Sequence, residues 1–495
     1  MTRAAVPAPD TPTPATDPPQ ERAQDPGDRA GAPAPAPPLR LTWVQPEDLV
    51  GHELRQAHED GRDARALAAR WYAAGGHPAP PTAGASPVAR PELRPLAEEI
   101  LDALAELPSP LAAHEPTDLA AIIAACPDWP DEPPATTRGT AGGEALRDRL
   151  HAAWLGRAAG CLLGKPVEKL PLSAIRALAR ATGNWPLADW FTARGVPGDL
   201  LAAHPWNRRS AATSLAENID GMPEDDDLNH PLLGLLLLQR HGRGFTTADL
   251  ARIWLDALPA GRTFTAERIA YRNLLDGVEP PLTASRRNPF REWIGAQIRA
   301  DVHGWTHPGN PAAAARQAHR DAVLTHTGNG VYGAMFVAAA LATAAGGTAD
   351  VHRALTAGLS VVPPRSRLAR AVREGIEAAR TGAPFDTVVD RLHARLGGYH
   401  WVHAVPNAAL LAAALTHADG DFTRSICAAV SGGWDTDSNG ATAGSLAGLL
   451  TGRPDRLPER WTAPLKNRLS TSVPSFDGIG FDTLAALTHS EAVRP

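Results

Sequence analysis

The 495-residue sequence has little of what marks several protein classes. Three cysteines cannot form a disulfide framework in so long a chain, and their odd number favours a reducing compartment. Alternating β-branched residues, which would predict strands, are nearly absent. The N-terminus has no basic segment followed by an apolar one, so no secretory signal is predicted. We therefore expect a cytoplasmic protein.

Clusters of basic residues and long apolar runs are also missing. The 48 basic and 54 acidic residues give a net charge of -6, which argues against an extended nucleic-acid-binding surface. Residues 232–238 are too few to span a bilayer, and residues 331–347 are mostly Ala and Gly, which suits a packed core helix better. We expect no membrane partner.

Composition divides the chain into four parts. Residues 1–39 are rich in Pro and Ala and predict a disordered tail, with a polyproline ligand as the alternative. Helical periodicity over residues 40–129 predicts an accessory region, and the Pro/Gly/Thr-rich residues 130–143 predict a linker. A catalytic domain is expected over residues 144–490.

Apolar residues at helical spacing predict an all-α fold with a compact multi-helix main domain. In the main domain the predicted helices cover residues 144–163, 231–240, 247–258, 311–323, 333–345, 350–359, 365–380, 406–416, 422–430 and 441–450.

Two acidic segments carry most of the functional information. The first acidic segment, residues 224–227, reads Glu-Asp-Asp-Asp, and the second, residues 431–440, contains Asp435, Asp437 and Ser438. Carboxylates brought together without a cation repel by about 1 to 4 kcal/mol per pair at ~4 Å. Oxygen donors alone favour Mg²⁺, Mn²⁺ or Ca²⁺ over Zn²⁺. The two segments therefore predict one metal site; the alternative is that each is only a solvated acidic first turn of a helix.

Each segment lies where a helix is expected to begin. Pro231 suits the first turn of the helix after the first segment, and Ser438 or Asn439 suits the cap of the helix after the second. The second segment also resembles the start of an EF-hand loop. That interpretation fails because position 12 of the loop would be Leu446 in place of a bidentate Glu.

In order and spacing, motifs from about Leu146 to Gly452 resemble the ADP-ribosylglycohydrolase family, which includes the hydrolase that reactivates ADP-ribosylated dinitrogenase reductase. Residues 156–168 are similar to the family's first helix and turn, with Cys161 at the place of an aspartate and Glu168 retained. Residues 433–438 are similar to its Gly-Gly-Asp-Thr-Asp-Thr motif, with Trp434 at the place of a small residue.

The first acidic segment resembles the family's Thr/Ser-Asp-Asp-Thr motif. Glu224 and Asp227 replace its hydroxyl residues, and Asp225 and Asp226 match its metal-binding aspartates. The resemblance implies two Mg²⁺ ions, with Mn²⁺ as an alternative, and hydrolysis of the glycosidic bond of an ADP-ribosyl group. The implied metal ligands are Glu224, Asp225, Asp226, Asp435, Asp437 and Ser438.

Further roles come from the same resemblance. Glu168 and Asp226 are the implied catalytic residues, with Glu168 as acid/base or water-positioning group. Gly295, Arg299 and His326 are the implied substrate-binding residues, although Arg299 also suits a salt bridge and His326 a structural cap. The expected partner is an ADP-ribosylated substrate or an ADP-ribose-like small molecule.

Two other functions stay open at this point. The departures at Cys161, Glu224 and Asp227 also suit a non-catalytic binder of ADP-ribose or of an NAD-derived metabolite. A structural metal site in an interaction protein is the third possibility.

Overall fold

The computed structural model describes residues 41–80, 90–131 and 143–494. The tail predicted over residues 1–39 lies outside these residues, as does nearly all of the linker predicted over residues 130–143. The described residues hold 22 α-helices and no strand, and 64% of these residues are helical. The prediction of an all-α fold is confirmed.

The helices alternate with short connections along the whole chain. The α-helices are α1 (Pro46–Glu59), α2 (Arg65–Ala73), α3 (Arg94–Ala105), α4 (Leu119–Ala125), α5 (Glu144–Gly164), α6 (Leu172–Ala181), α7 (Gly198–Ala203), α8 (Ala211–Ser214), α9 (Asp226–His241), α10 (Thr247–Ala257), α11 (Thr265–Leu275), α12 (Asp301–Trp305), α13 (Pro311–Ala322), α14 (Gly328–Ala345), α15 (Val351–Ser360), α16 (Arg367–Ala379), α17 (Phe385–Leu396), α18 (Ala404–Ala418), α19 (Phe422–Ser431), α20 (Thr436–Thr451), α21 (Glu459–Thr462) and α22 (Phe481–Val493). The 3₁₀ helices that the structure describes are η1 (Pro91–Leu93), η3 (Lys165–Val167), η4 (Gly242–Gly244), η5 (Ala260–Arg262), η6 (Leu282–Ala284), η7 (Ile294–Arg299), η8 (Pro454–Arg456) and η9 (Ala463–Leu465).

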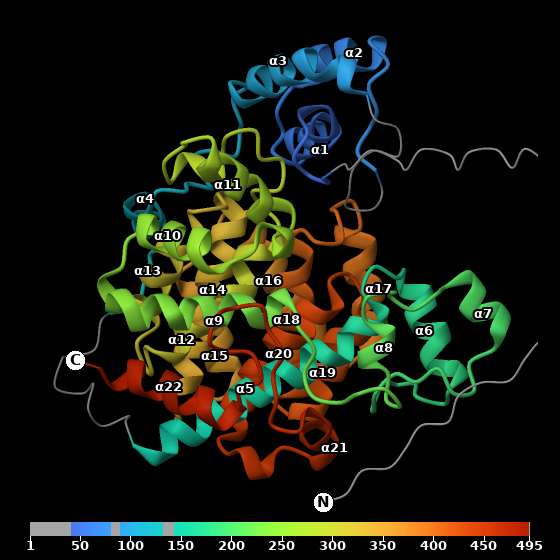
Figure 1. Ribbon diagram of the computed structural model, residues 1–495, viewed down its shortest axis with the longest axis vertical. Helices are drawn as coiled ribbons and strands as arrows, with labels where there is room; N and C mark the ends of the chain where they lie inside the picture. The colour runs from blue at the N-terminus through green and yellow to red at the C-terminus, as the bar shows by residue number, and fades with distance from the viewer. Residues whose placement is uncertain (1–40, 81–89, 132–142, 495) are drawn as a thin grey trace, which may run out of the picture. The chain divides into compact units, whose positions relative to one another are not determined.

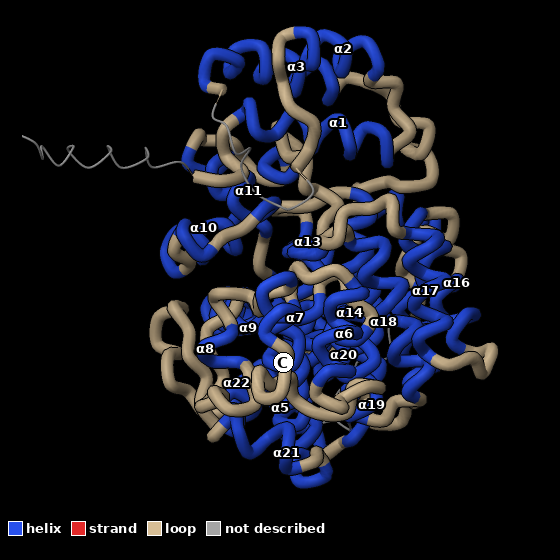
Figure 2. The backbone as a smooth tube through the Cα atoms, turned by 90° about the vertical axis from the view of Figure 1, so that its right-hand side faces the viewer, coloured by secondary structure: helices blue, strands red, loops and turns tan. Residues whose placement is uncertain are grey.

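The centre of the main body consists of helices that are buried on nearly every face. Helices α14, α18 and α20 have almost no exposed residue, which agrees with their uniform Ala, Gly and Leu content. Figures 1 and 2 show α14, α18 and α20 among the other helices of the main body and α1, α2 and α3 grouped away from them. Helix α14 is long and apolar enough to cross a membrane, but 94% of it is buried inside the protein, as a core helix would be.

Helices α5 and α20 approach each other through glycines. A Cβ atom added to Gly160 would lie 1.9 Å from the carbonyl oxygen of Gly440, and one added to Gly156 would lie 2.2 Å from that of Gly444. One turn further, a Cβ on Gly164 would lie 2.3 Å from the carbonyl oxygen of Thr436. Only glycine permits this backbone contact. It places the end of α5 beside the start of α20, which lies within the second acidic segment.

Both helices that carry acidic segments begin earlier than the sequence predicts. Helix α9 starts at Asp226, so Pro231 lies inside it and not in its first turn. A proline at this position cannot donate a hydrogen bond to the carbonyl four residues before it. That carbonyl, of Asp227, accepts one from the Nε of Arg157 at 2.7 Å instead. An arginine of α5 therefore compensates for Pro231 and ties α9 to α5.

Helix α20 starts at Thr436, with Asp435 in the capping position. The expectation that Ser438 or Asn439 caps this helix is therefore wrong, because both residues lie in its first turn. Helix α9 has an aspartate in the same place, since the Asp225 side chain accepts a hydrogen bond from the backbone N–H of Asp227 at 2.9 Å. Both acidic segments thus place carboxylates at the positive end of a helix dipole.

Candidate metal centre

The two acidic segments meet, although about 210 residues separate them in the sequence. The Ser438 hydroxyl donates a hydrogen bond to Oδ2 of Asp227 at 3.2 Å. The Thr436 hydroxyl donates to the carbonyl oxygen of Gly164 at 2.8 Å, which joins the second segment to the end of α5. The convergence expected from the sequence is therefore present, with α5 as the third element of the site.

Neighbouring carboxylates shift the ionisation of the aspartates at this junction. Burial, then Asp225 and Asp437, raise the pKa of Asp226 well above its ordinary value. Burial and then Asp437 raise the pKa of Asp435 in the same way. Burial and then Glu168 raise the pKa of Asp437 to about 7. Such shifts are expected where acidic groups are gathered in a low-dielectric site without enough positive charge.

Two cationic side chains of α5 and its following turn offset part of this charge. Lys165 forms an ion pair with Asp225. Although burial opposes both charged forms, this pairing lowers the pKa of Asp225 and raises that of Lys165. The fully buried guanidinium of Arg157 pairs with Asp227 at 3.3 Å and with Asp301 at 2.8 Å. The sequence did not single out either cation, because each pairs with a residue that is distant along the chain.

Cys161 lies beside the first acidic segment. Its sulfur and carboxylate oxygens of Asp225 and Asp227 lie within 4.8 Å of one another, so these three residues could hold a metal ion. Burial raises the pKa of the Cys161 thiol well above its ordinary value. A protonated thiol is a poor ligand for hard cations, which favour oxygen. The carboxylates are therefore the better ligands.

Glu168 lies directly after the turn that ends α5. Its carboxylate accepts a hydrogen bond from Nδ2 of Asn207 at 2.5 Å and pairs with Lys169 at 2.9 Å. It also contributes to the raised pKa values of Asp226 and Asp437. The structure therefore brings Glu168 to the aspartates, and its two partners fix its orientation.

Glu224 is directed elsewhere. One of its carboxylate oxygens pairs with Arg262 at 2.7 Å, and the other accepts hydrogen bonds from Asn229 at 3.2 Å and from the backbone N–H of Ser472 at 3.0 Å. These contacts give Glu224 a structural role at the start of α9. Its role as a metal ligand stays a prediction, and it would require one of these contacts to be exchanged.

The three predicted substrate-binding residues lie together in the core. Arg299 uses all five of its N–H donors, on Asp321, Glu267, Thr325 and the carbonyls of Gly295 and Asp321. Its binding to a phosphate would require one of these bonds to break. A Cβ on Gly295 would clash with the Glu267 carboxylate at 1.9 Å, so this glycine makes room for the network.

His326 is fully buried beside the same network. Its Nδ1 lies 2.5 Å from the Thr325 hydroxyl, while its Nε2 has no hydrogen-bond partner among the described residues. Burial and then Arg299 lower the pKa of His326 well below its ordinary value, so the ring is neutral. The substrate contact of His326 stays a prediction.

Asn407 of α18 positions the second acidic segment, although no sequence motif indicates this role. Its Oδ1 accepts hydrogen bonds from the backbone N–H of Asp435 at 3.1 Å and from Nδ2 of Asn439 at 2.7 Å. Trp434, just before Asp435, has a φ of 55° and stacks on His393 with the ring centroids 4.0 Å apart. A non-glycine residue in this conformation costs about 1 kcal/mol. The stacking and burial of the indole offset that cost.

A divalent cation fits this arrangement. Arg157 balances Asp227, Lys165 balances Asp225, and Lys169 balances Glu168. The remaining carboxylates, Asp226, Asp435 and Asp437, form no ion pair among the described residues, and Lys165 acts on Asp226 and Asp437 only as a minor influence. They are oxygen donors of the kind that Mg²⁺ and Mn²⁺ prefer. A second ion that used Asp225 would have to displace the Lys165 ammonium.

The chain is similar to known proteins in sequence and in structure. A sequence model of a family described as ADP-ribosylglycohydrolase matches residues 143–491, which include both acidic segments and Glu168. One similar solved structure is described as an "ADP-ribosylglycohydrolase-related protein complex"; it is 21% identical, with 71% of this chain and 99% of that chain covered and a TM-score of 0.44. No curated protein matches. Helices α1 to α4 lie outside the matched residues.

Proposed function

We propose that this chain cleaves the glycosidic bond of an ADP-ribosyl group with the help of Mg²⁺. The chain belongs to the ADP-ribosylglycohydrolase family and is therefore a hydrolase. The observation that supports this most is the hydrogen bond between Ser438 and Asp227, because it joins the two acidic segments into one site. The family depends on a metal, and the unbalanced carboxylates described above provide a site for one.

Asp226, Asp435, Asp437 and Ser438 would hold the cation, and Asp225 would join them for a second ion. Bound Mg²⁺ or Mn²⁺ would orient ribose hydroxyls and lower the pKa of a water molecule. Glu168 would act as the base for the attacking water. Asn207 and Lys169 hold its carboxylate in place. The buried carboxylates also stabilise the positive charge that develops on the sugar.

The experiment is to incubate the purified protein and Mg²⁺ with a panel of ADP-ribosylated substrates and to follow released ADP-ribose by mass. The panel would contain modified arginine, modified serine, a modified nucleic-acid base and a free metabolite. We expect release from at least one substrate, and its loss in Asp226→Ala and in Asp435→Ala. Unchanged turnover in both variants would eliminate the proposal.

A non-catalytic binder of ADP-ribose is the second candidate. The ion pair between Lys165 and Asp225 favours it, because a lysine then takes the place of part of the metal charge. Calorimetry would show metal-dependent binding of ADP-ribose without cleavage of any substrate in the panel. A cytoplasmic location is also part of the proposal, and it agrees with the three cysteines being free.

A further inference from the structure

A cavity of about 500 Å³ lies next to the candidate metal centre. Its lining includes Lys169, which directly follows Glu168, and Trp434, which directly precedes the first carboxylate of the second acidic segment. Tyr399 and Trp401 add aromatic surface, and Arg55 of α1 adds a guanidinium. The volume suits a nucleotide-sized ligand. Helix α1, which lies outside the residues that the family model matches, thus forms part of the wall of the cavity.

Arg55 is the cation of this cavity that lacks a carboxylate partner. Lys169 is paired with Glu168, but Arg55 forms no ion pair within the part of the chain that the structure describes. Its hydrogen bond to the Pro80 carbonyl is long, at 3.4 Å, and Glu59 acts on it only at longer range. Burial lowers the pKa of Arg55 from its ordinary value. A half-buried guanidinium without a partner favours an anionic ligand.

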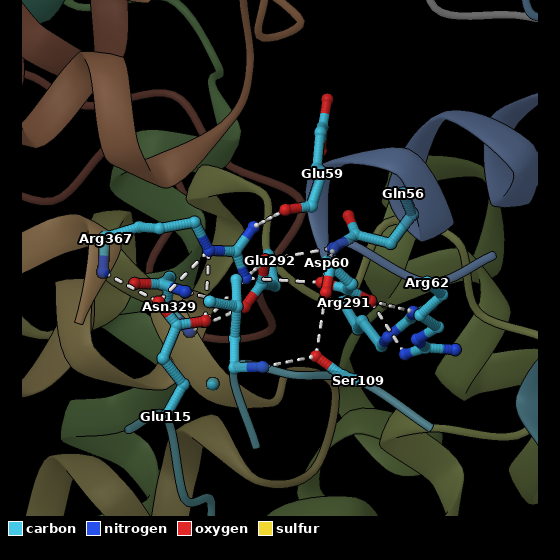
Figure 3. Close-up of polar contacts among 12 residues, drawn as sticks. Gln56, Glu59, Asp60, Arg62, Ser109, Glu115, Arg291, Glu292, Asn329 and Arg367 are labelled. Carbon is cyan, nitrogen blue, oxygen red and sulfur yellow. Dashed lines mark hydrogen bonds and ion pairs between the residues drawn. The ribbon is translucent and has the colours of Figure 1, made fainter. Parts of the chain in front are cut away.

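Buried polar contacts hold helix α1, which carries Arg55, against the main body. Figure 3 shows the buried polar network that joins α1 to the main body. Arg291 pairs with Glu53 at 2.7 Å and with Asp60 at 3.0 Å. Gln56, the neighbour of Arg55, donates to Glu292 at 2.9 Å. These contacts from α1 fix the segment that carries Arg55 and so fix where its side chain begins.

We propose that Arg55 binds the diphosphate of the ADP-ribosyl group, so that the N-terminal helices complete a substrate pocket whose reacting end is the metal centre. The inference rests on the proposed function for the identity of the ligand. It adds to that function a binding residue from outside residues 143–491, the part that the family match covers. The aromatic residues Tyr399, Trp401 and Trp434 provide apolar surface for the rest of the nucleotide.

Calorimetry of the full-length protein with ADP-ribose, which has the diphosphate but no aglycone, tests this directly. We expect Arg55→Gln to weaken ADP-ribose binding by about tenfold, as for a lost charge-assisted hydrogen bond. Arg55→Lys should keep part of the affinity, and adenosine, which has no phosphate, should bind all variants equally. Arg70→Gln is the matched control, because Arg70 is an exposed arginine of the same region that pairs with Glu99.

Equal ADP-ribose affinity in wild type and Arg55→Gln would overturn the inference, as would an absence of ADP-ribose binding to the wild type. A change confined to the turnover of a modified protein, with the affinity for ADP-ribose intact, would assign Arg55 to the aglycone and also overturn it. Arg55-dependent binding of ADP-ribose without cleavage of any substrate would support the inference while the proposed hydrolysis failed.

Discussion

Two interfaces hold this site in place, and they are built in opposite ways. Helices α5 and α20 meet through glycine backbones, as at Gly160 and Gly440, and no ion pair joins the described residues of the two helices. Helix α1 meets the main body through buried ion pairs of Arg291 and Arg367. The first interface depends on shape and lies within the family match, whereas the second depends on charge and joins a region outside it. The difference predicts different responses to substitution.

The largest effect is expected at the charged interface. Arg367→Ala removes the partner of Glu115, at 2.7 Å, and of Glu292, at 2.8 Å, and leaves buried carboxylates unpaired. Loss of one partner of a buried ion pair costs about 3 to 5 kcal/mol. Chemical denaturation would measure the change. Adding Glu292→Gln should restore part of the stability, and a double variant less stable than the single one would contradict a charge-based interface.

The next effect is expected at the glycine interface. Gly160→Ala places a methyl group 1.9 Å from the Gly440 carbonyl oxygen, and the two helices must separate to accept it. Overpacking of this kind costs about 1 to 3 kcal/mol. Gly244→Ala is the control, because nothing lies within 4 Å of a Cβ added there. Equal denaturation midpoints for the two variants would show that the helices do not depend on this contact.

A further effect is expected from pH when no metal is bound. The pKa of Asp437 rises from 3.8 to about 7 on folding, so the folded protein retains a proton that the unfolded chain has released. The contribution of this group to stability is complete below about 3.8 and is lost as the pH rises to about 7. The melting temperature with chelator should therefore fall over this range, and Mg²⁺ should oppose the fall. A rise with pH that Asp437→Asn leaves unchanged would contradict this.

The smallest effect is expected from the Lys165 ammonium in the metal centre. Lys165→Met removes the ammonium that pairs with Asp225, so a divalent ion meets less repulsion and should bind about tenfold more tightly. Lys466→Met is the control, because Lys466 pairs with Asp220 at the surface. Titration with Mn²⁺ would measure both affinities. Weaker binding in Lys165→Met than in Lys466→Met would show that the ammonium supports the ion.

The parts of the site that short sequence motifs define could be predicted from the sequence. Carboxylates at helix starts and Glu168 after the first helix could be recognised from short motifs. The ion pairs of Arg157 and Lys165 could not, because their partners follow them by 60 residues or more. Arg157 shows the reason: it donates to the carbonyl that Pro231 leaves without its helical partner, and it lies 70 residues away from that carbonyl in the sequence.

The same limit applies to the predicted substrate-binding residues. Arg299 matches a family motif, yet five internal hydrogen bonds occupy all its donors, and their acceptors come together only in the folded protein. Arg55 carries no motif, and its position on a cavity wall depends on how α1 packs against the main body. Whether residues 40–129 form a separate region, as composition predicts, stays a prediction.

Metal titration of two single variants tests most directly whether the acidic segments form one centre. Asp226→Asn removes a carboxylate of the first segment, and Asp435→Asn removes one of the second. If both segments hold the same ion, calorimetry with Mn²⁺ should show that each variant loses most of the wild-type affinity. Wild-type affinity and stoichiometry in either variant would mean that the ion is held by one segment alone.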